Sequence, residues 1–341
     1  MTDRGPTSSI DIGGPYFEDL TCGPEFESPA VTLTDGHAAL FQAVTGDRLR
    51  LPLDHRLSRA VTGSSAALAH PLLAINMAIG MSTEVSQQVR ANLFYRGLVL
   101  RRPVHIGDTL RTTTRVVALR QNRPQPDRPA TGIAVLEIVT RNQDDAEVLH
   151  FWRCPMLPCR NRDANTQQRD DVDRVGLQPT EREIEIAIPT SWQTAVIGSR
   201  WTGRKAADVG PGTHFRIESR DTITSAPELV RITLNMAMAH TDARLSYLGQ
   251  RLVYGGHVIA IAFAQVIRAL PNLLTMLGWE SCDHTAPALE GDRIRSEVTV
   301  LETRATGRGT ILKLHARSHA ARGDQDDEKQ VLDWKFWVLS L

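Results

Sequence analysis

The hydrophobic positions of this chain form two long apolar segments, and a series of alternating segments follows each of them. The first apolar segment spans 71–81, PLLAINMAIGM, and the second spans 257–270, HVIAIAFAQVIRAL, where Pro271 ends it. Both are apolar around nearly the whole circumference of a helix, which is typical of a helix buried on most sides. A helix of this kind needs a curved sheet around it, so each is predicted to lie against a β-sheet.

Alternation of hydrophobic and polar residues predicts a set of β-strands after each helix. Turn residues separate these strands, as at Gly107-Asp108 and Gly291-Asp292. The predicted strands span 93–101, 108–120, 131–141 and 147–155 in the first set, and 274–283, 292–303, 310–318 and 330–340 in the second. One long helix followed by antiparallel strands, twice, predicts an α+β fold.

Similarities between the two halves indicate that the chain arose by internal duplication. Three pairs of segments match in the same chain order: 103–111 with 287–295, 147–157 with 330–340, and, more weakly, 23–34 with 212–224. The first pair reads PVHIGDTLR and PALEGDRIR. Nearly constant spacing between the partners argues against chance similarity.

The duplication predicts the domain organisation. We expect the following parts: a flexible tail over 1–15, one α+β domain over 16–158, a linker over 159–205 and a second α+β domain over 206–341. The linker is polar and rich in Arg, Asp and Gln, which is typical of a solvated segment without a role of its own.

Composition and charge exclude several classes of protein. The 341 residues include 39 Lys plus Arg and 39 Asp plus Glu, and 41% are hydrophobic. A net charge of zero argues against a protein that coats nucleic acid or an anionic membrane. No apolar run approaches the roughly 18 residues needed to cross a bilayer. The polar, Gly/Pro-rich N-terminus is not a secretory signal, so a cytoplasmic location is expected.

The cysteines and histidines give no metal-binding pattern. The four cysteines form no CxxC motif, and Cys154 and Cys159, the only close pair, have no neighbouring histidine. We therefore expect reduced, structural cysteines. The histidines lack the HExxH spacing of a zinc enzyme, so a metal mechanism is not expected.

Several motifs together resemble the MaoC-like dehydratases. They are the Gly-Asp-x-[Leu/Ile]-Arg turn of both halves, the Tyr-Gly-Gly-His sequence at 254–257, and the Asn-x4-His sequence at 235–240. The resemblance covers nearly the whole chain outside the tail and linker. Within the family, the sequence is most similar to the mesaconyl-CoA (2-methylfumaryl-CoA) hydratase branch. It implies a double hot dog fold, in which two fused copies of a long helix are each wrapped by an antiparallel sheet. It also implies a lyase that adds or removes water across the α,β double bond of an acyl thioester, usually of coenzyme A, without metal or redox cofactor.

Hydration of an enoyl thioester requires a base for water, an acid for the α-carbon and donors for the thioester oxygen. In the family an Asp and a His five residues later supply the first two. The matching residues of the second half are Asn235 and His240, and Asp242 follows as a candidate substrate-binding residue. Because an amide cannot accept the proton, His240 is predicted to be the acid–base group, and Asn235 to hold the water.

The first half departs from this spacing. Asp47 follows Gly46 as the family's acid does, but the next histidine, His55, lies eight residues on rather than five. Asp47 and His55 therefore remain candidates for catalysis, for a structural role or for shaping a ligand site.

The entrance of the second buried helix is the candidate oxyanion hole, since unpaired N–H groups at a helix N-terminus favour negative charge. Gly255 and Gly256 allow a ligand close to the backbone, so the amides of Gly256 and His257 are the candidate donors, with Tyr254 as a candidate wall of the acyl pocket. Arginines are expected around the phosphates of coenzyme A. The candidates that the sequence offers are Arg96, Arg101, Arg102 and Arg295.

Other functions remain open at this point. The expected partner is a small-molecule acyl thioester, and the alternatives are a dehydratase of carrier-bound intermediates, a thioesterase, and a degenerate acyl-binding scaffold. The fused copies supply the pairing that single-copy relatives reach by dimerising, and association into a homodimer is a further arrangement that the fold allows.

Overall fold

The secondary structure repeats one plan in the two halves of the chain. The computed structural model describes residues 10, 12–125, 128–176, 178–323 and 327–341. The α-helices are α1 (Asp35–Thr45), α2 (Arg50–Leu53), α3 (His55–Thr62), α4 (Pro71–Met81), α5 (Glu181–Ile186), α6 (Ala226–Ile232) and α7 (Gly255–Ala269). The strands are β1 (Glu25–Glu27), β2 (Val31–Thr32), β3 (Ala91–Leu100), β4 (Thr109–Gln121), β5 (Thr131–Arg141), β6 (Glu147–Pro158), β7 (His214–Arg216), β8 (Asp221–Thr222), β9 (Leu273–Asp283), β10 (Arg293–Thr306), β11 (Gly309–Ala321) and β12 (Lys329–Ser340). The 3-10 helices are η1 (Phe17–Asp19), η2 (Glu84–Ser86), η3 (Val172–Arg174), η4 (Thr194–Arg200), η5 (Ala206–Asp208), η6 (Met238–His240) and η7 (Ala243–Leu245).

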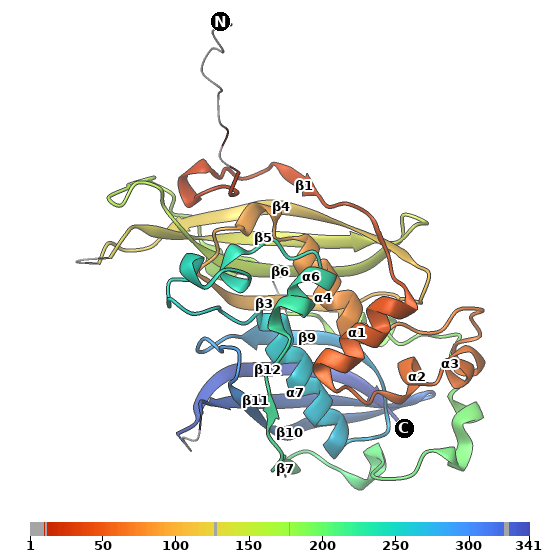
Figure 1. The fold of residues 1–341 in the computed structure, drawn as a ribbon. Helices are drawn as coiled ribbons and strands as arrows, with labels where there is room; N and C mark the ends of the chain where they lie inside the picture. Colours follow the sequence, from red (N-terminus) through yellow and green to blue (C-terminus); the bar gives the residue numbers. More distant parts are fainter. Residues whose placement is uncertain (1–9, 11, 126–127, 177, 324–326) are drawn as a thin grey trace, which may run out of the picture.

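One antiparallel sheet runs through both halves, as the stacked strands of Figure 1 show. Its main order is β1-β4-β5-β6-β3-β9-β12-β11-β10-β7, so the halves join where β3 pairs with β9. Val99 lies opposite Gly278 at this junction. A Cβ on Gly278 would lie 2.5 Å from the carbonyl oxygen of Leu98, so the close approach of the two central strands requires glycine.

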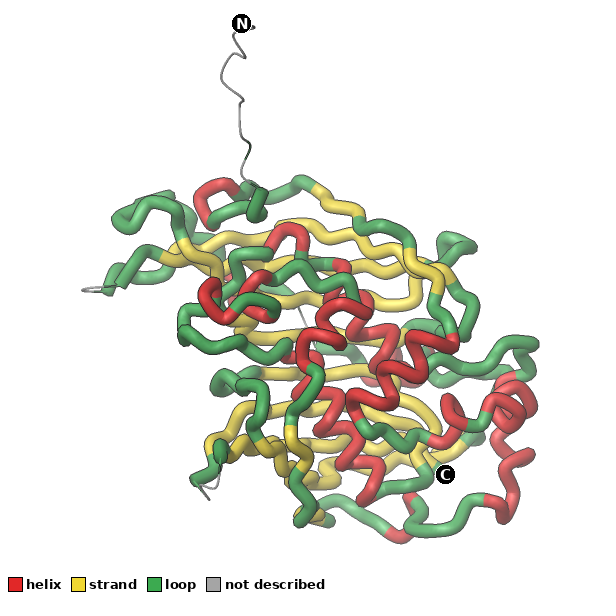
Figure 2. Tube along the Cα trace, viewed as in Figure 1, coloured by secondary structure: helices red, strands yellow, loops and turns green. Residues whose placement is uncertain are grey.

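The two long helices lie side by side on the same face of the sheet (Figures 1 and 2). Every residue of α4 is buried, and in α7 all except Gly255 and Arg268 are buried. Pro71 occupies the first turn of α4, where its missing N–H costs no hydrogen bond, and Nδ1 of His70 accepts from the Leu72 N–H. The aromatic rings of Phe263, Trp334 and Trp279 fill the space between α7 and the sheet.

The sequence predictions of these elements are confirmed. The first helix has the predicted bounds, and the second begins two residues earlier, at Gly255. All eight long strands are present, and their ends differ from the predicted ends by a few residues, as in β6, which continues to Pro158. The period-2 and helical patterns predict these elements correctly because each helix or strand buries a continuous face of side chains.

The prediction that the linker is wholly solvated is wrong for its second part. Ile184 on α5, together with Trp192, Ile197 and Trp201, is buried in a hydrophobic cluster. Leu274 and Leu277 of β9 belong to the same cluster. The connection is therefore a packed layer over the second half of the sheet. Ala187 and Ile188 also belong to this cluster, so six apolar residues between 184 and 201 are buried, although the segment is short and they stand among polar residues.

Within the described part of the chain, none of the helices has the length and apolar character required to cross a membrane.

Candidate active site

A cavity of about 240 Å³ lies between the two halves of the molecule. Ile79, Tyr95 and Arg153 line it from the first half, and His240, Tyr254 and Gly255 from the second. None of the described residues that line it is Asp or Glu. Neither half could form this cavity alone, so a ligand in it would contact both copies of the repeat.

His240 is held in the cavity wall as a neutral imidazole. It ends the 3-10 helix η6, and only 7% of the residue is exposed. Its Nδ1 lies 2.9 Å from the carbonyl oxygen of Leu252, which can only accept, so Nδ1 carries the proton and Nε2 is the basic nitrogen. Burial, with a contribution from the positive charge of Arg153, lowers the pKa of His240 to about 4.

The segment that carries His240 is docked onto the first half. The Met236 N–H donates to Oγ1 of Thr83 at 2.8 Å, and the Met238 N–H donates to the Gln87 carbonyl at 3.0 Å. Asn235 lines the cavity, and its Oδ1 accepts from the Ala237 N–H at 2.9 Å. The Nδ2 amide, which only donates, is therefore the polar group that Asn235 can offer to a ligand.

The N-terminus of α7 opens on the same cavity, where Gly255 forms part of the wall. The first N–H groups of a helix lack intrahelical acceptors. The His257 N–H donates to the Tyr254 carbonyl at 2.9 Å, so the amides of Gly255 and Gly256 are the better candidate donors. Both these amides and the helix dipole favour negative charge at this end of α7.

His284 is a second imidazole in the cavity wall, and no motif in the sequence pointed to it. It follows β9, and its Nε2 is buried and has no hydrogen-bond partner among the described residues. A Cβ on Gly255 would lie 2.4 Å from this nitrogen, so the imidazole lies against the first turn of α7. Burial and the neighbouring His240 lower the pKa of His284 to about 4.

Comparison with known proteins identifies the family. No family model matches the chain. A conserved hypothetical protein from Mycobacterium tuberculosis with a double hotdog fold is 44% identical, with a TM-score of 0.89 over 97% of this chain and 100% of that one. A MaoC domain protein dehydratase from Chloroflexus aurantiacus is 27% identical, with a TM-score of 0.82 over 98% and 99% of the chains. This chain belongs to the MaoC-like double hot dog family.

A curated relative bears on the branch of this MaoC-like family. Mesaconyl-CoA hydratase of Cereibacter sphaeroides is 28% identical over 353 residues, which cover 96% of this chain and 98% of that protein. The resemblance seen in the sequence motifs, and the double hot dog fold that it implied, are thus confirmed.

The first half of this MaoC-like protein does not bring Asp47 and His55 together. Oδ1 of Asp47 lies 3.0 Å from Nε2 of His70, the residue that caps α4, and both side chains are buried. His55 begins α3 and has Asp35 as its acidic neighbour, with 4.0 Å between Nδ1 and Oδ1. None of these side chains lines the cavity between the halves.

The remaining predicted residues of the second half are divided between the cavity and other sites. Tyr254 lines the cavity, and its hydroxyl donates to the Asn76 carbonyl at 3.2 Å. His257 does not line it, because its side chain is buried beside Val44 of α1. Asp242 is also outside the cavity wall: it caps η7 and pairs with Arg244 at 3.2 Å.

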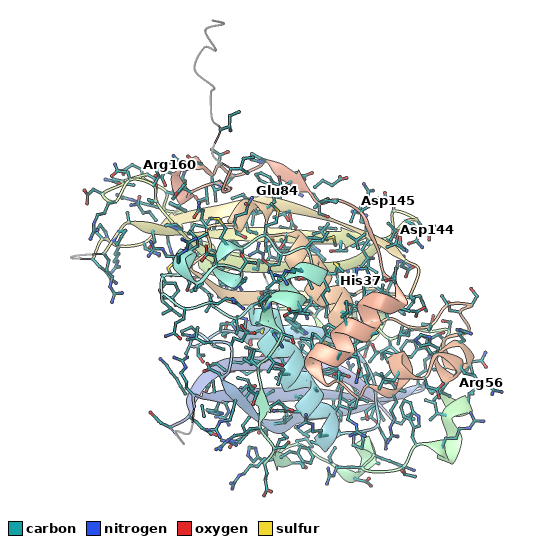
Figure 3. The ribbon with its side chains drawn as sticks, in the orientation of Figure 1. His37, Arg56, Glu84, Asp144, Asp145 and Arg160 are labelled. Carbon is teal, nitrogen blue, oxygen red and sulfur yellow. The ribbon has the colours of Figure 1, made fainter. Side chains whose placement is uncertain are left out.

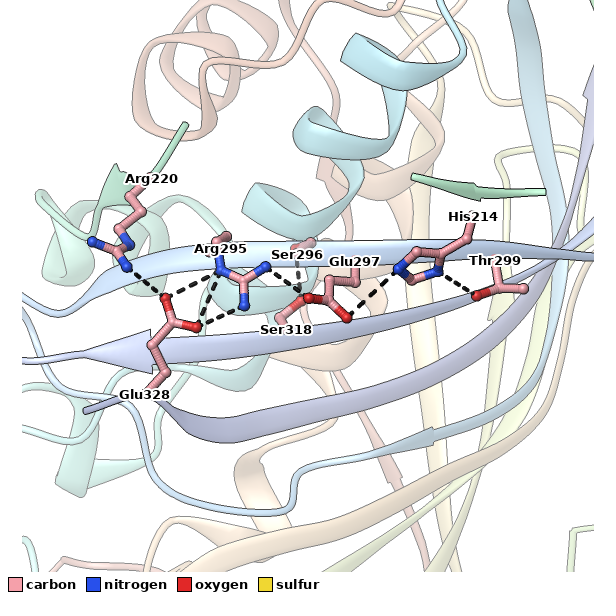
Figure 4. Close-up of polar contacts among 8 residues, drawn as sticks. All are labelled: His214, Arg220, Arg295, Ser296, Glu297, Thr299, Ser318 and Glu328. Atoms are coloured by element: carbon pink, nitrogen blue, oxygen red, sulfur yellow. Dashed lines mark hydrogen bonds and ion pairs between the residues drawn. The ribbon is translucent and has the colours of Figure 1, made fainter. Parts of the chain in front are cut away.

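Two of the arginines considered for coenzyme A are engaged elsewhere. Arg295 lies in an ion-pair network on the second half of the sheet, where Glu328 and Glu297 hold its guanidinium (Figure 4). Arg96 lies over the ring of Phe94. Neither lines the cavity.

A surface groove next to the cavity mouth holds other arginines. The groove shares Val89, Arg90 and Tyr247 with the cavity wall. Its described arginines come from both halves: Arg90, Arg160, Arg162 and Arg244. Arg160, which Figure 3 labels at the surface of the first half, also pairs with Asp19 at 2.7 Å. No sequence motif groups these positions, which lie in separate segments.

No metal centre is built into the described part of the chain, because it contains no cluster of three or more His, Cys, Asp or Glu side chains able to hold an ion.

Replacing Gly256 with alanine is expected to destabilise the protein by about 1–3 kcal/mol, the usual cost of overpacking. The new Cβ would lie 1.8 Å from Oδ1 of the buried Asn76, so α4 or the first turn of α7 must move. Chemical denaturation measures the change. Gly210→Ala is the matched control, since no atom lies within 4 Å of its Cβ position. Equal stability of the two variants would contradict the close packing.

Proposed function

We propose that this protein is a hydro-lyase that adds water to, or removes it from, the α,β double bond of a short acyl-CoA, with His240 as the acid–base group. One observation carries the proposal: a neutral imidazole and the N-terminus of a buried helix face one cavity between the two halves. The reactions named for the curated hydratase and the related dehydratase support it.

In the hydration direction, Nε2 of His240 takes a proton from water while the oxygen forms a bond to the β-carbon. The π electrons of the double bond move toward the thioester carbonyl, whose oxygen gains negative charge. The N–H groups of Gly255 and Gly256 and the dipole of α7 stabilise that charge. The imidazolium then returns the proton to the α-carbon. Dehydration is the reverse sequence.

Two further side chains assist the reaction in this proposal. His284 stays neutral at pH 7, and in the tautomer that carries the proton on the unpartnered Nε2 it donates to the same thioester oxygen beside the helix N-terminus. A neutral imidazole at a helix N-terminus is a known electrophilic group. Asn235 holds the reacting water through its Nδ2 amide, consistent with its position in the cavity wall.

Coenzyme A, rather than a carrier protein, is the proposed carrier of the acyl group. The groove next to the cavity mouth supports this, because it presents guanidinium groups that suit phosphates. The groove and the cavity together would hold the nucleotide and the acyl end of one molecule.

Incubation of the purified chain with crotonyl-CoA, mesaconyl-CoA and itaconyl-CoA tests the function. We expect loss of the conjugated-thioester absorbance with at least one substrate and a product heavier by one water. Release of free thiol would indicate a thioesterase instead. Turnover of a carrier-tethered substrate alone would favour the biosynthetic alternative. Binding without any reaction would leave the acyl-binding scaffold.

A further inference from the structure

Arg153 is a buried cation that has no acidic partner among the described residues. It lies on β6 and is 3% exposed. Nε donates to Oγ of Ser82 at 2.9 Å, and Nη2 donates at 2.7 Å both to the Ser82 carbonyl and to Oγ of Ser86. These acceptors are all neutral. In the described residues, no carboxylate lies within ion-pair distance of the guanidinium.

Such a group is costly for a folded protein. Removing a guanidinium from water without an opposite charge is unfavourable, and arginine does not lose its proton to avoid the penalty. Buried charges are therefore paired as a rule. A buried arginine with neutral partners on one side and a cavity on the other is arranged to receive its counter-charge from a ligand.

The cavity wall around Arg153 supports this arrangement. Nη1 makes no hydrogen bond to any described residue, and Arg153 lines the cavity together with Tyr95. Burial raises the pKa of Tyr95, so its hydroxyl stays protonated and can donate to an anion. The wall has no acidic side chain among its described residues, which leaves the cavity electropositive.

Arg153 lies inside the cavity, whereas Arg90 lies at its mouth. Arg90 lines both the cavity and the adjoining groove, but Arg153 lines the cavity alone. Arg153 is also near enough to His240 for its charge to lower the pKa of that imidazole. An anion bound at Arg153 therefore belongs to the acyl part of the substrate, not to the phosphates of the nucleotide.

We propose that Arg153, with the Tyr95 hydroxyl, binds a carboxylate at the far end of the acyl group and so selects carboxylated acyl-CoA substrates over neutral ones of the same length. This inference rests on the proposed function for its catalytic consequence, but the binding site itself does not. Arg153 is a specificity-determining residue in this scheme, because the carboxylate that it holds takes no part in the bond changes.

The catalytic test compares two substrates that differ in one group: crotonyl-CoA, which has a methyl group at the β-carbon, and fumaryl-CoA, which has a carboxylate there. We expect the wild-type protein to prefer fumaryl-CoA in kcat/KM. Arg153→Met should lower kcat/KM for fumaryl-CoA at least about 30-fold more than it lowers kcat/KM for crotonyl-CoA, since only the fumaryl carboxylate loses a buried charge pair. Arg153→Lys should retain part of the preference. Arg90→Met is the matched control and should affect both substrates alike.

A binding test on the wild-type protein separates this inference from the hydratase proposal and does not depend on the folding of a variant. Succinyl-CoA and butyryl-CoA are saturated, cannot be hydrated, and differ in the same way. Calorimetry should show tighter binding of succinyl-CoA even if the protein hydrates nothing. Equal affinities for the two thioesters, or an Arg153→Met variant that keeps the fumaryl-to-crotonyl ratio, would overturn the carboxylate site.

Discussion

Replacing His240 with glutamine is expected to lower kcat/KM for enoyl-CoA hydration by about 1,000-fold, within the range that general acid–base groups contribute. Glutamine keeps the size and a polar end of the side chain but cannot exchange a proton. The residual rate should come from the donors at the N-terminus of α7. His214→Gln, in the network of Figure 4, is the matched control and should retain full activity, because His214 does not line the cavity.

The pH dependence gives a second readout of the same group. Burial lowers the pKa of His240 to about 4, so the imidazole is neutral and able to act as a base above about pH 5. We expect kcat/KM for hydration to be flat through neutral pH and to fall as the pH decreases through about 4. The decrease should be absent from the residual activity of His240→Gln. An inflection near the ordinary histidine pKa, about 6.5, would show that the imidazole is exposed to water.

Folding must be followed in the same experiment. His257 and His284 also have pKa values lowered to about 4 by burial. A histidine that is harder to protonate when folded makes stability decrease as the pH falls below its unfolded pKa. Circular dichroism at each pH separates loss of the fold from protonation of the active imidazole.

The second large effect is expected at His284. Truncation to alanine should lower kcat by about 100-fold, the usual loss when one donor to a developing oxyanion is removed. His284→Gln should recover part of the rate, because its amide N–H can donate to the same oxygen. Steady-state measurement gives kcat and KM, and the single-turnover rate constant tests whether the loss lies in the chemical step.

The pH dependence of the variants distinguishes the role of His284 from that of His240. Since His284 is proposed to donate without transferring a proton, its variants should keep the pH profile of the wild-type protein. An altered acid limb in His284→Gln, or an unchanged kcat in His284→Ala, would contradict the donor role. The former would point to proton transfer through His284, and the latter to a packing role beside Tyr95.

Some features of the site follow from residues close together in the sequence. The Asn235–His240 spacing lies in one short segment, and the Gly255-Gly256 pair begins a helix whose apolar pattern is continuous. Both could be recognised without coordinates, and Asn235, His240 and Gly255 line the cavity. The catalytic roles assigned to them remain predictions.

Other features depend on contacts that no local pattern encodes. The sequence leaves the roles of Asp47 and His55 open, and the fold places Asp47 beside His70 rather than His55, because the turn before α4 returns to the end of α1. Arg153, Tyr95 and His284 are separated in the chain and gave no motif. They meet only because β6, β3 and β9 are neighbours in one sheet.

The sequence by itself determined the repeated α+β plan, the two buried helices and most of their strands, since hydrophobic periodicity is a local property and each copy repeats it. Tertiary structure alone decided how the copies face each other, that part of the linker is packed, and which side chains surround the cavity. Those outcomes depend on strand pairing and close packing between distant segments, such as the approach of Leu98 to Gly278. The charge of Arg153 is visible in the sequence, but only the fold removes it from water and surrounds it with neutral hydrogen-bond acceptors.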